Sequence, residues 1–455
     1  MAARAAFVAV ALLLAACGGT LVDHHGTGIL SDSASCGGGE VACGGRCVAQ
    51  SPDACGASCA LCGEPPANAT EICTPVGAGG HDGVCDFVCD DGLLRCGSGC
   101  CAPALVASGS DFTCASSTAG EVHCFGAGDL GQLGNASTLD RATATKLRGF
   151  TSPVSALAAG DGHACAISGT VTKCWGDGPA FGSLGTVTDP QDVPSLANAT
   201  KIAAGAAHTC AVKANGDVLC VGEGAIAGGG FQSAATLGGQ AIDVASSDGF
   251  TCALVNTGSG NAVKCWGNNA FGQLGDAVAG IPPEGASTVA VTVPLPSSTI
   301  QKISAGTRHA CAGGSTNGQE LYCWGANGSL QLGQLGTGIQ APTYFPDSTL
   351  HKPIESVAAG GLATCAVVND NGTHRPYCWS SDPLVSGGVN LNGKPNPLPP
   401  NTTGGFAFSA GASHTCYVDA SQSPPRLACF GLGDRGRLGN GSIVSSATPV
   451  LAIDR

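Results

Sequence analysis

The sequence predicts an all-β chain in which a small disulfide-rich module precedes a seven-bladed β-propeller. Between Cys114 and Cys429, two cysteines 9 to 13 residues apart recur seven times, each pair followed by a glycine-rich stretch. Successive first cysteines lie 51, 45, 42, 59, 54 and 51 residues apart, which indicates a repeat architecture. The runs between turns are short and lack helical periodicity, and seven such units suit closure into a ring. A β-solenoid is the alternative, although its period is normally shorter.

Each cysteine pair predicts a β-hairpin, because the midpoint of the pair falls on residues that favour a tight turn. Asn371-Gly372 suits a type I′ turn and Gly169-Thr170 a type II′ turn. Three further midpoints are three-residue loops with glycine in third place, at 118–120, 214–216 and 316–318. Directly opposed residues of antiparallel strands are close enough for a disulfide, so each pair is predicted to be a cross-strand disulfide. The pairs are Cys114 with Cys124, Cys165 with Cys174, Cys210 with Cys220, Cys252 with Cys265, Cys311 with Cys323, Cys365 with Cys378 and Cys416 with Cys429. The alternative is that these cysteines are small buried hydrophobic residues.

Three short strands are expected in each repeat, and the third repeat shows them. They cover residues 201–205, 208–212 and 217–220, with the cysteines in the second and third strands. One cysteine pair per repeat does not supply the four ligands of a structural zinc site.

The amino terminus predicts export. One early positive charge, an apolar run over residues 5–14 and the small residues before Cys17 are typical of a signal peptide over residues 1–16. The ending Leu14-Ala15-Ala16-Cys17 resembles the lipobox of bacterial lipoproteins, which implies lipidation of Cys17. Gly18 follows instead of Asp, so transfer to the outer membrane, facing either the periplasm or the exterior, is favoured. An ordinary secretory signal followed by a free cysteine is the alternative.

The cysteine count agrees with an oxidising compartment. Without Cys17, the 27 cysteines divide into 12 between Cys36 and Cys101 and 14 in the predicted hairpins, both even numbers. Residues 17–35 are expected to form a flexible tether, residues 36–101 a cysteine-rich disulfide module, and residues 102–455 the propeller. Within the module, Cys59-Ala60-Leu61-Cys62 has the spacing of a redox or zinc half-site, but a structural disulfide role is favoured. The module resembles cysteine-rich segments of exported myxobacterial proteins.

The repeats share a phrase that runs Ala-Gly-x-x-His-Thr-Cys-Ala, then x-Cys-Trp-Gly, then Asn-x-Phe-Gly-Gln-Leu-Gly. Its last part is most complete at residues 265–275. The phrase resembles the repeat of the regulator of chromosome condensation family over about three quarters of the chain, and this resemblance implies a seven-bladed propeller.

The variable positions of the phrase are predicted to be packing positions and not a shared catalytic set. Histidine stands in four repeats and is replaced by Phe112, Phe250 and Ala363 in the others; its nitrogens are expected to bond backbone groups between blades. All four tryptophans follow a second cysteine and are expected to form core between blades. The histidines are His163, His208, His309 and His414, and the tryptophans are Trp175, Trp266, Trp324 and Trp379. The last strand, within residues 448–453, is expected to pair with the first repeat and close the ring.

Sites for chemistry are not apparent in the sequence. No nucleophile elbow, phosphate-binding loop, paired-histidine zinc motif or calcium-loop spacing occurs, so no catalytic, cofactor or metal residue is predicted. A net charge of −13 disfavours nucleic acid as a partner.

The favoured function is therefore a lipid-anchored extracytoplasmic module that binds an envelope or extracellular protein or glycan, or acts structurally, without catalysis. Contacts are expected from the long insertions at 276–294 and 380–403. Guanine-nucleotide exchange, implied by the family resemblance, is one alternative; a hydrolase with two carboxylates on one propeller face is the other.

Overall fold

The structure is a computed structural model, and it describes residues 40–43, 46–49, 65–76, 82–222, 231–276, 285–296, 299–314, 320–334, 338–345, 350–388, 393–398 and 406–454. The chain divides into two compact units. One comprises Met1–Asp90 and Gly97–Cys100, and the other comprises Asp91–Cys96 and Cys101–Arg455. The predicted signal peptide, tether and Cys17 lie outside the described residues.

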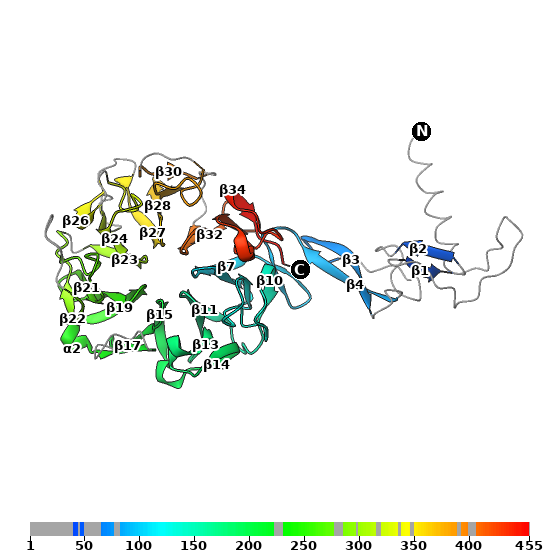
Figure 1. Cartoon of the computed structure of the whole chain (residues 1–455), viewed down its shortest axis with the longest axis horizontal. Helices are drawn as coiled ribbons and strands as arrows, with labels where there is room; N and C mark the ends of the chain where they lie inside the picture. Colours follow the sequence, from blue (N-terminus) through cyan, green and yellow to red (C-terminus); the bar gives the residue numbers. More distant parts are fainter. Residues whose placement is uncertain are drawn as a thin grey trace, which may run out of the picture. The chain divides into compact units, whose positions relative to one another are not determined.

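The larger unit is a seven-bladed β-propeller, which confirms the predicted fold class. Seven four-stranded antiparallel sheets follow one another along the chain and surround a central opening (Figure 1). The strands of blades one to four are β7 (Pro103–Ser108), β8 (Phe112–Ser117), β9 (Val122–Gly126), β10 (Arg141–Lys146); β11 (Val154–Ala159), β12 (His163–Ser168), β13 (Val171–Asp177), β14 (Thr186–Asp192); β15 (Ala199–Ala204), β16 (Thr209–Lys213), β17 (Val218–Val221), β18 (Phe231–Gln232); β19 (Gln240–Ser246), β20 (Phe250–Asn256), β21 (Asn261–Gly267) and β22 (Ser287–Thr292). Blades five to seven contain β23 (Ile300–Ala305), β24 (His309–Gly314), β25 (Leu321–Ala326), β26 (Ile339–Tyr344); β27 (Ile354–Ala359), β28 (Thr364–Asp370), β29 (Thr373–Trp379), β30 (Asn396–Pro397); β31 (Phe406–Ala410), β32 (His414–Asp419), β33 (Arg426–Gly431) and β34 (Ser446–Leu451). The short helices are η1 (Gly178–Phe181), η2 (Pro194–Leu196), α2 (Ala234–Leu237) and η4 (Asp434–Gly436).

The second and third strands of every blade are joined by a disulfide between directly opposed residues, as the cysteine spacing predicts. In blade two, Cys165 lies opposite Cys174, with a Cα–Cα distance of 4.1 Å. Because the cysteine side chains are buried, each disulfide is part of the blade core. The other six bonds join Cys114 to Cys124, Cys210 to Cys220, Cys252 to Cys265, Cys311 to Cys323, Cys365 to Cys378 and Cys416 to Cys429.

The hairpin turns have the backbone conformations that their sequences favour. Asn371 and Gly372 both have positive φ, of 54° and 85°, as a type I′ turn requires. Gly169, Gly120 and Gly216 also have positive φ, of 63°, 83° and 82°. The predicted loop at 316–318 lies outside the described residues.

The histidines of the repeat phrase connect four of the seven blades, namely two, three, five and seven, to the blade that follows. His163 Nε2 lies 2.7 Å from Thr209 Oγ1 of the following blade, and His414 of blade seven lies 2.8 Å from Thr113 of blade one. His208 and His309 contact Thr251 and Thr364 in the same way. The expectation of a backbone partner was therefore wrong for Nε2: the partner is a side-chain hydroxyl, supplied by the residue just before the first cysteine of the next blade.

Three of the four tryptophans also bridge blades, through their indole N–H groups. The indole N–H of Trp175 donates to the carbonyl oxygen of Gln132 in the preceding blade, at 2.9 Å. Trp324 donates in the same way to Gln273 of blade four, and Trp379 to Gln331 of blade five, which lie in the segments Gly-Gln-Leu-Gly and Leu-Gln-Leu-Gly. Blades two, three, six and seven lack such a segment. The blades that follow two, six and seven carry Val221, Phe430 and Phe125 at the tryptophan position, whereas Trp266 follows blade three and its indole N–H has no partner within the described residues.

Ring closure differs from the prediction. β34 does not pair with the first repeat; it pairs with β33 as the outer strand of blade seven, so no strand is exchanged between the first and last blades. Within the carboxy-terminal segment 446–454, main-chain contact with blade one is made by the residues beyond β34, where Ala144 N–H donates to the Ile453 carbonyl at 2.8 Å. The reason is that every repeat already ends with its own outer strand, a fourth strand that the three-strand reading of the repeat omitted.

The smaller unit contains β-hairpins and is held by a disulfide. β1 (Glu40–Cys43) pairs with β2 (Arg46–Ala49), and β3 (Ala69–Val76) pairs with β4 (Asp82–Cys89). Cys89 is bonded to Cys100 within this unit, whereas Cys96 and Cys101, at the ends of β5 (Leu94–Cys96) and β6 (Gly99–Cys101), are bonded in the larger one. The Cys59-Cys62 motif lies outside the described residues.

Candidate functional site

The propeller has two faces of different composition. One carries the loops between the first and second strand of each blade, which contain or precede the histidines, and we call it the histidine-loop face. The other carries the turns between the second and third strands, and we call it the hairpin face. Surface features that could bind a partner occur on both faces, and they are compared below.

A groove crosses the histidine-loop face from blade four to blade seven. Its volume is about 630 Å³, and its lining includes Phe271, Arg308, Ile339, Leu362 and Ser413. Leu362 is 38% exposed although it is a large apolar side chain. The groove therefore combines apolar surface with one cationic group, and it draws its lining from separate segments of the chain.

The cation of this groove is not neutralised within the described part of the protein. The Arg308 guanidinium lies 4.5 Å from the centre of the Phe271 ring, so the aromatic face holds the charge in place. No carboxylate among the described residues pairs with it. Arginine and aromatic residues dominate the binding energy of many protein interfaces, so this pair is a suitable anchor.

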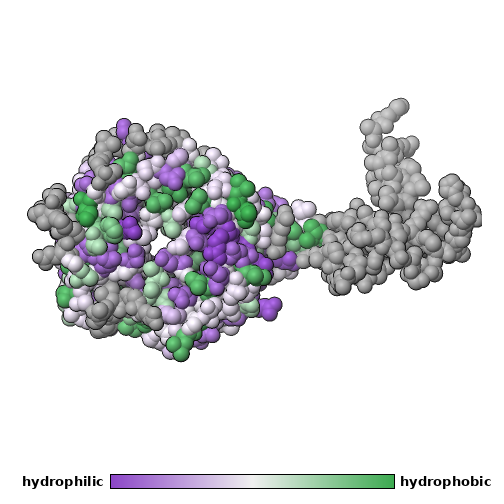
Figure 2. Space-filling model, in the orientation of Figure 1, coloured by the Kyte–Doolittle hydropathy of each residue, from purple (hydrophilic) through white to green (hydrophobic). Residues whose placement is uncertain are grey.

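A cluster of aspartates and two arginines occupies the same face where blade seven meets blade one. Arg435 contacts Asp140 at 3.0 Å and Asp129 at 2.9 Å, while Arg437 contacts Asp111 at 2.9 Å. Figure 2 shows a hydrophilic patch beside the central opening, in the region where η4 and the strands of blade one lie in Figure 1. Because the arginines come from blade seven and these aspartates from blade one, the cluster fastens the two ends of the ring.

This cluster does not suit acid–base catalysis. The hydrogen bond from Arg435 lowers the pKa of Asp140. Burial opposes ionisation of Asp129, but the hydrogen bonds from Arg435 and Gln132 outweigh it and lower the pKa of this carboxyl as well. Both carboxylates are therefore held ionised, and neither can serve as the proton donor that a glycoside hydrolase requires. Asp161 differs, since burial raises its pKa while Ser110 donates a hydrogen bond to it at 2.8 Å.

The central channel is narrow at the histidine-loop face and wider inside. The narrow part, of about 60 Å³, is lined by the glycines that end the first strands, such as Gly109 and Gly160. A Cβ on Gly160 would lie 2.1 Å from the Gly205 carbonyl oxygen of the next blade, which explains the glycine of the phrase. The wider part, of about 230 Å³, is lined by small and apolar side chains, including Leu157 and Phe408.

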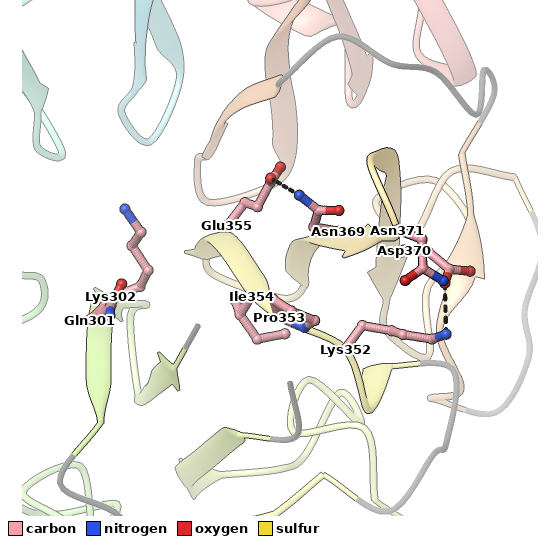
Figure 3. A pocket seen from close by; sticks show the side chains of 9 residues that line it. All are labelled: Gln301, Lys302, Lys352, Pro353, Ile354, Glu355, Asn369, Asp370 and Asn371. Carbon is pink, nitrogen blue, oxygen red and sulfur yellow. Dashed lines mark hydrogen bonds and ion pairs between the residues drawn. The ribbon is translucent and has the colours of Figure 1, made fainter. Parts of the chain in front are cut away.

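A pocket of about 670 Å³ on the hairpin face lies between blades five and six (Figure 3). It is lined by charged and amide side chains, but most of these already have partners. Lys352 contacts Asp370 at 2.7 Å, and Asn369 donates to Glu355 at 2.9 Å (Figure 3). Glu355 also contacts His374. Because these charges are internally paired, the pocket offers a partner less than the groove does.

Within the described part of the chain, no three His, Cys, Asp or Glu side chains gather closely enough to hold a metal ion. Among the same residues, no helix has the length and apolar character needed to cross a bilayer.

The sequence analysis did not find the groove. The predicted contact segment 276–294 is described only at residue 276 and from residue 285, and segment 380–403 only at 380–388 and 393–398. Phe271 belongs to the repeat phrase, while Arg308 and Leu362 stand in loops whose residues vary between repeats. A signal was nevertheless present, because these two residues replace the small or acidic residues that other repeats place before the histidine position.

Known proteins support the fold and the repeat assignment. The description "Regulator of chromosome condensation (RCC1) repeat" matches residues 104–132, 199–225 and 241–273, and a second description of the same repeat matches 119–167. The class defined by fold and motif is thus a seven-bladed propeller in which RCC1 repeats are found within the first four blades.

Among individual proteins, the chain is similar to the ultraviolet-B receptor UVR8 of Arabidopsis thaliana. The two are 30% identical over 303 residues, which cover 60% of this chain and 64% of that receptor, so the match spans less than two thirds of the relative's length. The crystal structure of human WBSCR16 matches with a TM-score of 0.61 at 18% identity, covering 73% of this chain and 93% of that one. Prp20p of Saccharomyces cerevisiae matches with a TM-score of 0.43 at 20% identity, covering 76% of each chain.

Proposed function

We propose that the protein is an exported, lipid-anchored binding module whose propeller holds a protein partner in the groove of the histidine-loop face. The observation that carries this proposal is the Arg308 cation, which is positioned by Phe271 beside the exposed Leu362 and lacks a carboxylate partner among the described residues. A partner that fits would present an acidic side chain to Arg308 and an apolar side chain to Leu362.

A protein partner is favoured over a glycan by the composition of the groove. Its apolar lining and single guanidinium suit a protein that presents one apolar and one acidic side chain. Glycan sites would use the planar amides and paired carboxylates that occur in the hairpin-face pocket, and those groups are already bonded to one another. The fold adds indirect support, since a propeller presents loops on a rigid scaffold, which suits recognition of a partner.

Export is supported by the disulfides of all seven blades, because buried disulfides in series are typical of oxidising compartments. We propose that Cys17 carries the lipid and that the anchor lies in the bacterial outer membrane. The test is metabolic labelling with a radioactive fatty acid: the label should be found on the purified wild-type protein, after removal of free lipid, and not on purified Cys17→Ser. Label in both proteins would overturn the anchor without affecting the groove.

The groove is tested by a photo-crosslinking amino acid placed at Leu362 in the exporting cell. The expected result is a single cross-linked protein that is lost when Arg308→Glu is added and is absent when the crosslinker stands at Asn371 on the hairpin face. A cross-link that persists in Arg308→Glu would show that the partner does not use this groove. Nucleotide exchange on a small GTPase receives no support from an oxidised, exported chain, and no described feature favours it.

A further inference from the structure

The outer edges of the blades show a repeated protective device that the repeat phrase does not include. In blades two, five, six and seven, the residue immediately before the one opposite the second cysteine is proline. These prolines are Pro190, Pro342, Pro395 and Pro449. Proline has no N–H, so an outer strand with proline at this position cannot donate a hydrogen bond there to another strand.

The main chain at this position faces away from the blade. The residue three places later donates its N–H inward to the third strand, as Val293 does to the Val263 carbonyl at 2.9 Å and Phe345 does to Leu321 at 2.8 Å. Hydrogen-bonding direction alternates along a strand, so the proline position points outward. The register shifts just before this position in these strands, but in blade one, which has the same shift, the equivalent N–H of Ala144 does point outward, to Ile453. Six blades are described at this position. In four of them the residue is proline, which has no N–H, and in a fifth the outward N–H is already hydrogen-bonded.

Blade one is the covered case. Its equivalent residue is Ala144, whose outward N–H donates to the Ile453 carbonyl at 2.8 Å, and the chain end runs parallel to β10 at this point. An extended segment therefore occupies this edge when the proline is missing. The equivalent residue of blade three lies outside the described residues.

Blade four has neither device. Its equivalent residue is Ala290 in β22, and no described residue bonds the outward main chain of Ala290 or Thr292. Residues 285–296 carry no charge, and Val289 is 70% exposed. Long, uncharged, β-branched edges are the ones through which strands of different chains pair.

We propose that β22 is a self-association edge, through which two copies of the chain pair as antiparallel strands about a two-fold axis at Val291. In this register Ala290 exchanges both main-chain hydrogen bonds with Thr292 of the second copy, and Thr292 does the same with Ala290 of the second copy. A second copy is the occupant that fits because the run is uncharged, so that identical strands meet without like-charge repulsion, and because the register repeats itself under the two-fold. Blade four of each ring then continues into one eight-stranded sheet.

The test is sedimentation equilibrium of the full chain with its disulfides formed, carrying Cys17→Ser so that lipid cannot drive association. Concentrations up to about 300 µM are needed, because interfaces that bury less than roughly 1,200 Å² are weak. The mass should rise with concentration towards twice the monomer value. Ala290→Pro, which installs the proline of four other blades, should remain monomeric with an unchanged melting temperature.

Two further variants keep the result interpretable. Val289→Lys places a charge on the same edge and should weaken dimerisation even if the proline variant folds poorly. Leu184→Lys, at an exposed leucine of blade two, adds the same charge elsewhere and should dimerise as the wild type does. A constant monomer mass for the wild type, or a dimer that persists in both Ala290→Pro and Val289→Lys, would overturn the proposal. Arg308→Glu should leave the dimer unchanged, which separates this edge from the groove.

Discussion

Acidification should destabilise the propeller through its four inter-blade histidines. Burial lowers the pKa of His163, His309 and His414 to about 3 and that of His208 to about 4, against 6.5 for an unperturbed side chain. A folded-state pKa below the unfolded one means that the unfolded chain binds protons first. Stability is therefore complete above pH 6.5 and is lost progressively as the pH falls from 6.5 towards 3.

The magnitude follows from the same pKa values. At pH 5.5, each histidine with an unfolded pKa of 6.5 costs the folded state about 1.4 kcal/mol, and the four together cost about 5 kcal/mol relative to pH 7.5. Such a loss is comparable with the whole stability of many domains. Guanidinium chloride unfolding at a series of pH values, with the disulfides intact, measures it directly.

The matched control for the acid effect is His163→Phe, because blades one and four carry phenylalanine at this position in Phe112 and Phe250. The variant should lose about a quarter of the pH dependence and take up about 0.9 fewer protons on unfolding at pH 5.5. An unchanged dependence in His163→Phe would refute the assignment of the acid sensitivity to these imidazoles.

Three further outcomes are expected. Trp175→Phe leaves a buried carbonyl in blade one without its donor and should cost about 1 kcal/mol more than Trp266→Phe, whose indole N–H has no partner within the described residues; chemical denaturation of both variants compares them. Arg437→Ala should destabilise more than Arg435→Ala, and its effect should change less with salt, because the Arg437 side chain is 5% exposed and that of Arg435 is 31% exposed; thermal melts at low and high ionic strength test this, and equal salt responses would contradict it. Truncation after Ala447 removes most of β34 and the segment that reaches blade one, so the melting temperature should fall sharply; an unchanged melt would show that these contacts are dispensable.

Local sequence signals predicted the hairpins well because each depends on few residues. The turn at Asn371-Gly372 needs positive φ at both positions, and these residue types supply it at little cost. The cysteine pairs were predictable for a similar reason, since their spacing around a known turn fixes which residues face each other.

Interactions between blades were harder to predict, because their partners lie more than 40 residues apart in sequence and belong to different repeats. The threonines that precede the first cysteine in four blades gave no indication that their hydroxyls would bond a histidine of the preceding blade. The bonds from Trp175, Trp324 and Trp379 to glutamine carbonyls join residues that are distant in sequence, so no local pattern indicated them. The pairing of β34 was predicted wrongly because it depends on how many strands each blade has. The sequence pattern indicated three strands per repeat, whereas each blade has a fourth, outer strand, and β34 is that strand in blade seven.

Each blade is formed by one continuous segment of the chain, and this has a mechanical consequence. Each of the seven blade disulfides joins two strands of one blade, so none of them spans neighbouring blades. A pulling force applied to the two chain ends would load the contacts between blades seven and one first, and the ring would open there into a linear string of internally locked units. The residues enclosed by each disulfide could not extend under force, so stretching would proceed in seven short steps. A reductant would be needed to release the remaining length.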